Sequence, residues 1–319
     1  MRAKDSKKST ISLLIIIAVV IAAMFIINVI CKYNFLTVNN WMLIIAGAVI
    51  PTFTAWGLCF LFAANVTDFS IGAMVILGAN LAGTWGNSVG IPGVLVGGLL
   101  IGICLTMANF LVFNLSKIPS WIAGMGMTLI YESIGVVYSN KRLAEGKQVV
   151  QLENELRIFG MSPWIYIILI IGGIVAYILY NKASVGINIR AVGNNPHVAK
   201  QMGIPIMKTL LCCGLIAGIF FGCSAFLTES YPGRATAAAG LSSISNIFQA
   251  LAAVLLAQVM QKKINITIAI PISTILIMAI FNVQTQLGVR SGTYQQVVLG
   301  AIVLIFGIIA QRGAKGVVK

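Results

Sequence analysis

The sequence predicts an all-α fold: a polytopic transmembrane bundle of about ten spans, with one short helix outside the membrane. Of the 319 residues, 59% are hydrophobic and only 9% are charged, and the mean hydropathy is +0.99. Soluble domains carry about a quarter charged residues. Apolar runs long enough to cross a bilayer, about 20 residues each, recur along the chain. We therefore expect a single membrane domain, 1–319, rather than two soluble domains.

Ten apolar segments define the predicted spans, which are 11–31, 41–64, 71–86, 93–115, 119–139, 162–181, 209–228, 243–261, 264–284 and 293–311. The first follows a basic start, as a cleavable signal would. Its apolar run is too long for a typical signal core, and no small-residue cleavage site follows it. We therefore expect a retained span, and ten spans place both termini on the same side of the membrane.

The basic residues decide the predicted orientation. The net charge is +14, but the basic residues are scattered over many loops without the aromatic platforms of a nucleic-acid site, so no nucleic-acid partner is expected. An N-terminus in the cytoplasm assigns fourteen of the 21 basic residues to that side: Arg2, Lys4, Lys7, Lys8, Lys117, Lys182, Arg190, Lys200, Lys208, Lys262, Lys263, Arg312, Lys315 and Lys319. This excess favours a cytoplasmic-membrane protein with both termini in the cytoplasm.

One polar segment, 181–208, separates the sixth and seventh spans. Within it, Asn195 is a good helix N-cap, Pro196 suits the first helical position, and Gly203 suits the end. These residues predict a short helix over 196–202.

A helix this short is only marginally stable in water, so we expect it to fold in contact with another surface. Val198 and Met202 share one face, while His197, Lys200 and Gln201 offer polar contacts. This pattern suits docking on a soluble protein. The alternative is an amphipathic segment that lies on the lipid surface.

A few polar side chains near the apolar segments are candidates for a solute pathway. Because burying a charge in hydrocarbon is costly, Asp68 and Glu132 should face protein, water or a cavity. With Ser70 and Asn109, they are the side chains we expect along such a pathway. The alternatives are that Asp68 or Ser70 caps the third span, and that the other two make bonds between helices.

Two further polar loops, 140–161 and 229–240, lie between predicted spans. The first has a mixed-sign surface that suits water or a protein partner. The second suits either part of an entrance or an ordinary turn.

The chain offers little material for catalysis. It has one histidine, so a histidine-based metal site is not expected. It has no phosphate-binding loop, nucleophile elbow or HExxH motif. We expect no metal, no cofactor and no enzymatic activity, and any use of ATP would require a separate chain.

Three segments resemble the permease subunits of bacterial ABC importers of the ribose and simple-sugar type. VTDFSIGAMVILGA is similar to that family's Asp-Leu-Ser-Val-Gly segment, with Asp68, Ser70 and Gly72 matching and Phe69 and Ile71 substituted. IPSWIAGMGMTLIYESIGVVYSN resembles its Pro-x-x-Ile-x-Thr-Leu-Gly span. GINIRAVGNNPHVAKQMGI resembles its cytoplasmic coupling region and is the most specific match.

This resemblance implies a subunit that imports a sugar or related small polar solute without covalent chemistry. Its partners would be two ATP-binding ABC subunits, a second permease copy or paralogue, an extracytoplasmic solute-binding protein and membrane lipid. The short helix would be the coupling helix, driven by closure of the ATPase pair. The residues expected to serve coupling are Arg190, Asn194, Asn195, Pro196, His197, Lys200, Gln201 and Gly203.

The chain departs from this family in one respect. Glycine is frequent up to residue 240 but absent from 241 to 287, where the family usually has a glycine-rich segment. The eighth and ninth spans should therefore pack differently, which suggests a divergent substrate or the atypical half of a heterodimer. The alternatives are an ion-coupled secondary transporter, an ABC permease for a nucleoside or amino acid, and a membrane-embedded enzyme.

Overall fold

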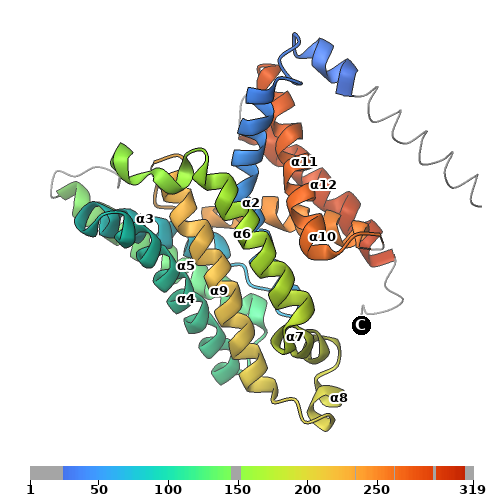
Figure 1. Ribbon diagram of the computed structural model, residues 1–319. Coiled ribbons are helices and arrows are strands. Elements are labelled where there is room, and N and C mark those ends of the chain that lie inside the picture. The colour runs from blue at the N-terminus through green and yellow to red at the C-terminus, as the bar shows by residue number, and fades with distance from the viewer. Residues whose placement is uncertain (1–23, 145–151, 234, 262, 290–291, 313–319) are drawn as a thin grey trace, which may run out of the picture.

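The computed structural model describes residues 24–144, 152–233, 235–261, 263–289 and 292–312 (Figure 1). Within these ranges the protein is helical and contains no β-strand. In chain order the elements are α2 (Val38–Ala63), α3 (Ile71–Val89), α4 (Ile91–Ser116), α5 (Ser120–Ala144), η1 (Asn154–Leu156), η2 (Ile158–Gly160), α6 (Trp164–Tyr177), η3 (Ile178–Lys182), α7 (Ser184–Asn194), α8 (Pro196–Gln201), α9 (Ile206–Ser230), η4 (Ser242–Asn246), α10 (Ile247–Met260), α11 (Ile266–Gln286) and α12 (Thr293–Arg312).

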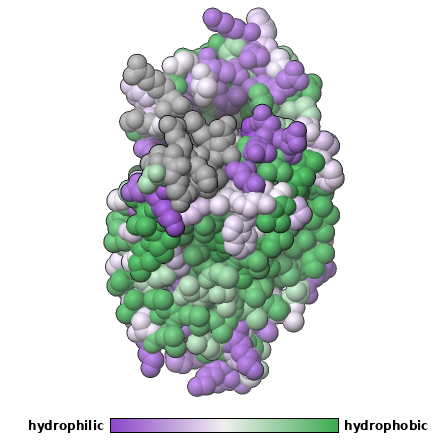
Figure 2. All heavy atoms as spheres, turned by 90° about the vertical axis from the view of Figure 1, so that its left-hand side faces the viewer, coloured by the Kyte–Doolittle hydropathy of each residue, from purple (hydrophilic) through white to green (hydrophobic). Residues whose placement is uncertain are grey.

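Seven of the described helices are long and apolar enough to cross a membrane. They are α2, α4, α5, α6 with η3, α9, η4 with α10, and α11. An apolar surface covers the middle of the face shown in Figure 2, with hydrophilic residues above and below it. The all-helical membrane fold is therefore confirmed, whereas the number of ten spans stays a prediction. The predicted first span, 11–31, lies mostly outside the described residues.

Two groups of helices flank a centre made by α2. Helices α10, α11 and α12 lie together on one side, and α3, α4, α5 and α9 lie on the other (Figure 1). Helix α2 contacts members of both groups, and α6 packs against it. Its middle is buried accordingly, with Ala48, Val49 and Ala55 fully inaccessible.

Glycines bring α4 and α9 into backbone contact. A Cβ on Gly102 of α4 would lie 2.4 Å from the Cα of Gly222 on α9, and one on Gly218 would lie 2.9 Å from the Cα of Ile103. A Cβ on Gly98 would meet Phe226 at 2.7 Å. Small residues spaced four apart let membrane helices approach this closely. We call this contact the glycine seam.

Helices α10 and α11 achieve close packing without glycine. Four alanines of α10, Ala250, Ala252, Ala253 and Ala257, are almost completely buried, and α10 packs against α2, α11 and α12. Alanine is the next smallest side chain, so it also allows near approach while favouring the helix. The close contacts of α10 are therefore made through buried alanines.

Side-chain hydrogen bonds join α2 to α11 at three levels. Near one end, Asn40 and Asn282 exchange bonds of 3.1 and 2.8 Å. In the middle, the hydroxyls of Thr52 and Thr274 lie 2.6 Å apart. At the third level the Trp56 indole N–H donates to the Thr267 carbonyl over 2.9 Å. Pro271, four residues on, has no N–H with which to bond that carbonyl, so Trp56 takes the place of the missing helical bond. We call this contact the polar seam.

The polar segment after α6 contains two helices, so the expectation of one isolated helix was wrong. Helix α7 begins at Ser184 and ends at Asn194, directly before α8. It was missed because it is only 11 residues long and contains Gly186 and Gly193, which are poor helix formers. A Cβ on Gly193 would lie 2.0 Å from the Ala63 carbonyl, so α7 packs against the end of α2. Its stability therefore comes from tertiary contact.

The caps predicted for the short helix are present. The Asn195 side chain accepts hydrogen bonds from the N–H groups of His197 and Val198 at 3.0 and 3.2 Å. Pro196 occupies the first position of α8, which ends at Gln201, one residue earlier than expected. Gly203 follows with a φ of +80°, a conformation that favours glycine.

Replacing Gly102 with alanine should destabilise the protein by about 1–3 kcal/mol, because the added methyl group meets backbone that has no room to move away. Thermal unfolding of the detergent-purified protein measures the effect. Gly126→Ala on α5 is the matched control, since a Cβ there meets nothing within 4 Å. Equal losses for both variants would contradict the glycine seam.

Candidate functional site

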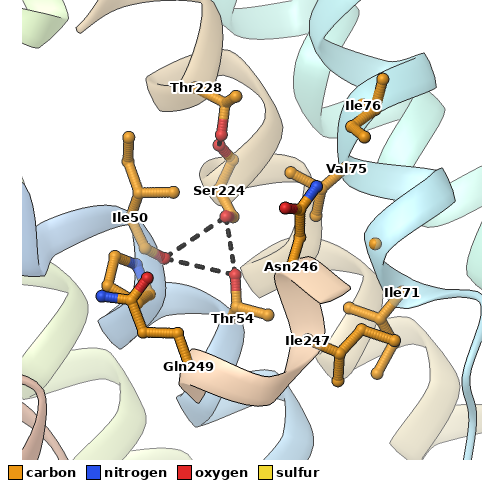
Figure 3. Close-up of a pocket in the computed structure, with 12 residues that line it drawn as sticks. Ile50, Thr54, Ile71, Val75, Ile76, Ser224, Thr228, Asn246, Ile247 and Gln249 are labelled. Atoms are coloured by element: carbon orange, nitrogen blue, oxygen red, sulfur yellow. Dashed lines mark hydrogen bonds between the residues drawn. The ribbon is translucent and has the colours of Figure 1, made fainter. Parts of the chain in front are cut away.

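A cavity of about 250 Å³ lies where the two helix groups meet α2 (Figure 3). Helices α2, α3 and α9 form three of its walls, and η4 with the start of α10 forms the fourth. The lining residues are Ile50, Pro51, Thr54, Ile71, Gly72, Val75, Ile76, Ser224, Thr228, Asn246, Ile247 and Gln249. None of these side chains is ionisable.

The polar groups of the cavity are hydroxyls and amides. The hydroxyls of Thr54 and Ser224 lie 2.8 Å apart, and both lie 3.3 Å from the carbonyl oxygen of Ile50 (Figure 3). On the facing wall, Gln249 Nε2 lies 2.8 Å from the Met278 sulfur, and the Asn246 side chain is exposed. Groups of this kind can both donate and accept hydrogen bonds. The lining therefore suits an uncharged solute that carries hydroxyl groups.

Sequence reasoning missed these cavity residues. Ser224 and Thr228 lie one helical turn apart within an apolar span, which marks a polar stripe along α9. Small hydroxyl side chains in membrane helices also bond their own backbone, as Thr228 does to the Ser224 carbonyl at 2.7 Å. Without the packing order, the sequence offered no way to decide which stripe faces a cavity.

Asp68, Ser70 and Asn109 meet in one buried hydrogen-bond cluster. Asp68 Oδ1 accepts from the N–H and the hydroxyl of Ser70 at 2.8 and 2.7 Å, and Asp68 Oδ2 accepts from Asn109 Nδ2 at 2.8 Å. The Tyr131 hydroxyl donates to Asn109 Oδ1 at 2.7 Å. The cluster therefore joins the entry of α3 to α4 and α5. Ser70 is the N-cap residue of α3, but its own side chain makes no capping bond.

Glu132 lies outside this cluster, beside the backbone segment that leads into α10. Its carboxylate accepts from the N–H groups of Leu241 and Ser243 at 2.7 and 2.8 Å. Leu241 has a φ of +66°, which is rare for a residue with a side chain. The two charge-assisted bonds hold this turn, from which η4 begins.

The two carboxylates thus support two neighbouring walls of the cavity. Asp68 holds the start of α3, and Glu132 holds the start of η4 and α10. These two walls touch, because a Cβ on Gly72 would lie 2.0 Å from the Ser243 carbonyl oxygen. None of the four residues predicted along the pathway lines the cavity itself, although Ser70 directly precedes Ile71.

The residues predicted to serve coupling lie at one end of the bundle, which we call the α8 end. The side chains of Asn195, His197, Lys200 and Gln201 are exposed, as is Val198, and Met202 is 72% exposed. Arg190 is different, because its guanidinium lies 4.9 Å from the centre of the buried Tyr180 ring. Arg190 therefore holds α7 against η3, while α8 presents a free face.

The two loops at the opposite end contact each other. Arg157 donates to the carbonyls of Ser230 and Tyr231 at 3.2 and 2.6 Å. A cation at the carboxyl end of a helix is favourable, so Arg157 stabilises the end of α9. Part of the loop 140–161 therefore has a structural role, while 145–151 lie outside the described residues.

Comparison with known proteins gives a family match over most of the chain. The model of the family described as "Branched-chain amino acid transport system / permease component" matches residues 40–307. Among curated proteins, the galactose/methyl galactoside import permease protein MglC of Haemophilus influenzae is 25% identical over 225 residues, which are 64% of this chain and 66% of that protein. The autoinducer 2 import system permease protein LsrC of Escherichia coli is 26% identical over 200 residues, 59% of this chain and 57% of that protein.

A third relative is named for a different substrate. The probable branched-chain amino acid transport permease protein LivH of Methanocaldococcus jannaschii is 29% identical over 190 residues, 53% of this chain and 59% of that protein. The matched region spans less than two thirds of each of these relatives' own lengths. No solved structure gives a significant match.

Glu132→Gln should destabilise the protein by about 1.5–3 kcal/mol, because an amide offers only one acceptor oxygen to two backbone N–H groups. The unfolding midpoint of the purified protein measures this loss. Glu153→Gln is the matched control, since Glu153 is exposed. An unchanged midpoint for the Glu132 variant would show that its carboxylate does not hold the turn.

Proposed function

Because the chain belongs to the branched-chain amino acid transport system / permease component family, we propose that it is the transmembrane subunit of an ATP-driven importer for a sugar or related small polar solute. The family match over 40–307 carries this proposal. The subunit works by alternating access and performs no covalent chemistry. ATP is hydrolysed by separate ABC subunits.

In the proposed topology the chain forms one permease domain of ten spans with both termini in the cytoplasm. The described helices occupy the positions of the second to tenth predicted spans. The α8 end is cytoplasmic, and Lys182, Arg190, Lys200 and Lys208 lie at it. This arrangement agrees with the excess of basic residues in cytoplasmic loops.

We assign α7 and α8 as the region that docks the ATPase subunits. Helix α8 exposes Val198 and Met202 beside Lys200, so it presents an apolar contact with a basic rim. Ala199 faces inward and is buried, which fixes the helix against the bundle. Asn194, Asn195, Pro196 and Gly203 shape the helix ends, and His197 and Gln201 complete its polar surface.

For the solute, we propose the cavity between α2, α3, α9 and α10 as a station on the pathway. Its lining of hydroxyl, amide and apolar groups favours an uncharged polyhydroxy compound over an amino acid, whose two charges would find no ionised partner there. Relatives named for galactose and autoinducer 2 import agree with this choice. Asp68, Ser70, Asn109 and Glu132 serve the pathway indirectly by holding its walls.

The complete importer includes further chains. A second permease copy or a paralogue packs against this one within lipid, and an extracytoplasmic solute-binding protein delivers the solute to the end opposite α8. An ion-coupled secondary transporter is the alternative. It would move solute without an ATPase partner, and ionisable pairs at mid-membrane would be expected.

Met202→Asp should abolish co-purification of the ATPase subunits, because a charge then replaces an apolar contact at the docking face. Mild solubilisation followed by quantification of the bound ATPase subunits measures this loss of co-purification. Met161→Asp is the matched control: Met161 is 44% exposed and lies directly after η2, at the opposite end of the bundle. If wild-type chain carries no ATPase subunit, the proposed function is wrong.

Vesicles that contain the complete complex, with ATP inside, should take up a labelled monosaccharide and not leucine. Asn246→Ala should lower this uptake about fivefold, the equivalent of one lost hydrogen bond to solute. Ser245→Ala is the neighbouring control, since its hydroxyl bonds the Ser242 carbonyl at 2.7 Å instead. Uptake of leucine alone would overturn the sugar assignment.

A further inference from the structure

The π-helical turn η3 contacts three helices, namely α7, α2 and α11. It interrupts the end of α6 over Ile178–Lys182 and is followed at once by α7. Such turns are rare and occur frequently at functional sites. Each of these contacts is made by particular residues.

Towards α7, the contact is rigid. A Cβ on Gly186 would lie 2.1 Å from the Leu179 carbonyl, so the α7 backbone rests directly on η3. The Arg190 guanidinium covers the Tyr180 ring, which is buried against Phe60 of α2 with ring centres 5.4 Å apart. A displacement of α7 must therefore carry η3 with it.

Towards α11, the contact is a reciprocal pair of amides, and Asn181 Nδ2 also donates to the Thr267 hydroxyl at 3.4 Å. Asn265 Nδ2 donates to Asn181 Oδ1 at 2.8 Å, and Asn181 Nδ2 donates to Asn265 Oδ1 at 3.3 Å. Asn265 is also the N-cap of α11, because its Oδ1 accepts from the N–H and the hydroxyl of Thr267 at 3.1 and 2.8 Å. The amide pair thus holds Asn265, which caps the first turn of α11.

From this first turn, two contacts lead towards the cavity. Trp56 bonds the Thr267 carbonyl and so ties the turn to α2, which carries Thr54 into the cavity lining. Helix α11 also packs along α10, which contributes Ile247 and Gln249 to that lining. The structure therefore holds a continuous chain of bonded and packed groups from α7 to the cavity wall.

We propose that the Asn181–Asn265 amide pair transmits movement of α7 and α8 to α11 and thereby to the cavity wall formed by α10. This inference rests on the proposed function. Asn181 and Asn265 are positioning residues, because neither lines the cavity nor lies on α8. The competing route runs along the chain itself, from α8 through 202–205 into α9.

Amide hydrogen exchange in the purified complex, with and without ATP and vanadate, tests this route. In the wild-type complex, the addition of ATP and vanadate should change amide hydrogen exchange in α7 and α8 and also in the first turn of α11. In Asn181→Ala, the response of α7 and α8 should persist, while the response of α11 should be lost. ATP hydrolysis should continue, but solute uptake should fall with the α11 response.

Two further variants separate transmission from simple loss of stability. Asn265→Ser keeps a good N-cap for α11 but is too short to pair with Asn181, which retains towards α11 only its long 3.4 Å bond to the Thr267 hydroxyl, so the α11 response should fall towards the Asn181→Ala result. Asn114→Ala is the matched control, because Asn114 bonds the carbonyl four residues earlier, as Asn181 does, and no other element. It should respond as the wild type does.

The outcomes distinguish the two proposals. If the wild-type complex shows no exchange response to ATP and vanadate, the proposed function fails. If the wild type responds and the α11 response survives in both Asn181→Ala and Asn265→Ser, the amide pair is not the route. Loss of the α9 response instead of the α11 response would overturn the inference in favour of the direct chain connection.

Discussion

Irregular backbone inside an apolar bundle must find its hydrogen-bond partners within the protein, and this constraint governs the centre of the structure. Two stretches leave helical geometry there: the entry to α3 after Ala63, and the chain leading into α10. Buried N–H groups without partners are costly where water is scarce. Asp68 supplies acceptors for the first stretch and Glu132 for the second. Few acidic residues occur in the chain, and these two lie where backbone needs them.

The helices around this centre associate by two different physical means. At the glycine seam, α4 and α9 approach so closely that their backbones touch, and dispersion contacts hold them. At the polar seam, α2 and α11 are joined by separate hydrogen bonds at three levels. A contact of the first kind has no room to slide, whereas separate hydrogen bonds can be exchanged one at a time. The α4–α9 contact is thus made largely by backbone, whereas the α2–α11 contact is made by side chains.

The cavity lies between these two groups, so any change in their relative position alters its shape. Its walls from α3 and α9 belong to the group that contains the glycine seam, and its wall from α10 belongs to the other group. The proposed docking region at α7 and α8 contacts the central helix α2 through Gly193 and the group of α10, α11 and α12 through η3 against α11. Helix α8 exposes the face that a partner can push, while buried Ala199 anchors it.

The sequence by itself determined the fold class, most helix positions and the caps of α8. These features follow from local rules, namely hydrophobic run length and the chemistry of Asn195, Pro196 and Gly203, which act within a few residues of chain. It also indicated that Asp68 and Glu132 face protein, water or a cavity, because a charge in an apolar segment is costly to bury in hydrocarbon. The presence of α7 was not predicted, since its stability comes from contact with α2 and η3 rather than from its own pattern.

Only the tertiary structure decided which polar residues meet. Asp68 and Asn109 are 41 positions apart, Glu132 and Ser243 are 111 apart, and Thr54 and Ser224 are 170 apart. Such pairings depend on how each helix is rotated and on which neighbours it has, and almost featureless apolar helices encode neither in a readable period. The placement of the two carboxylates on the solute pathway stays a prediction, and the folded chain bonds them to the backbone at the starts of α3 and η4.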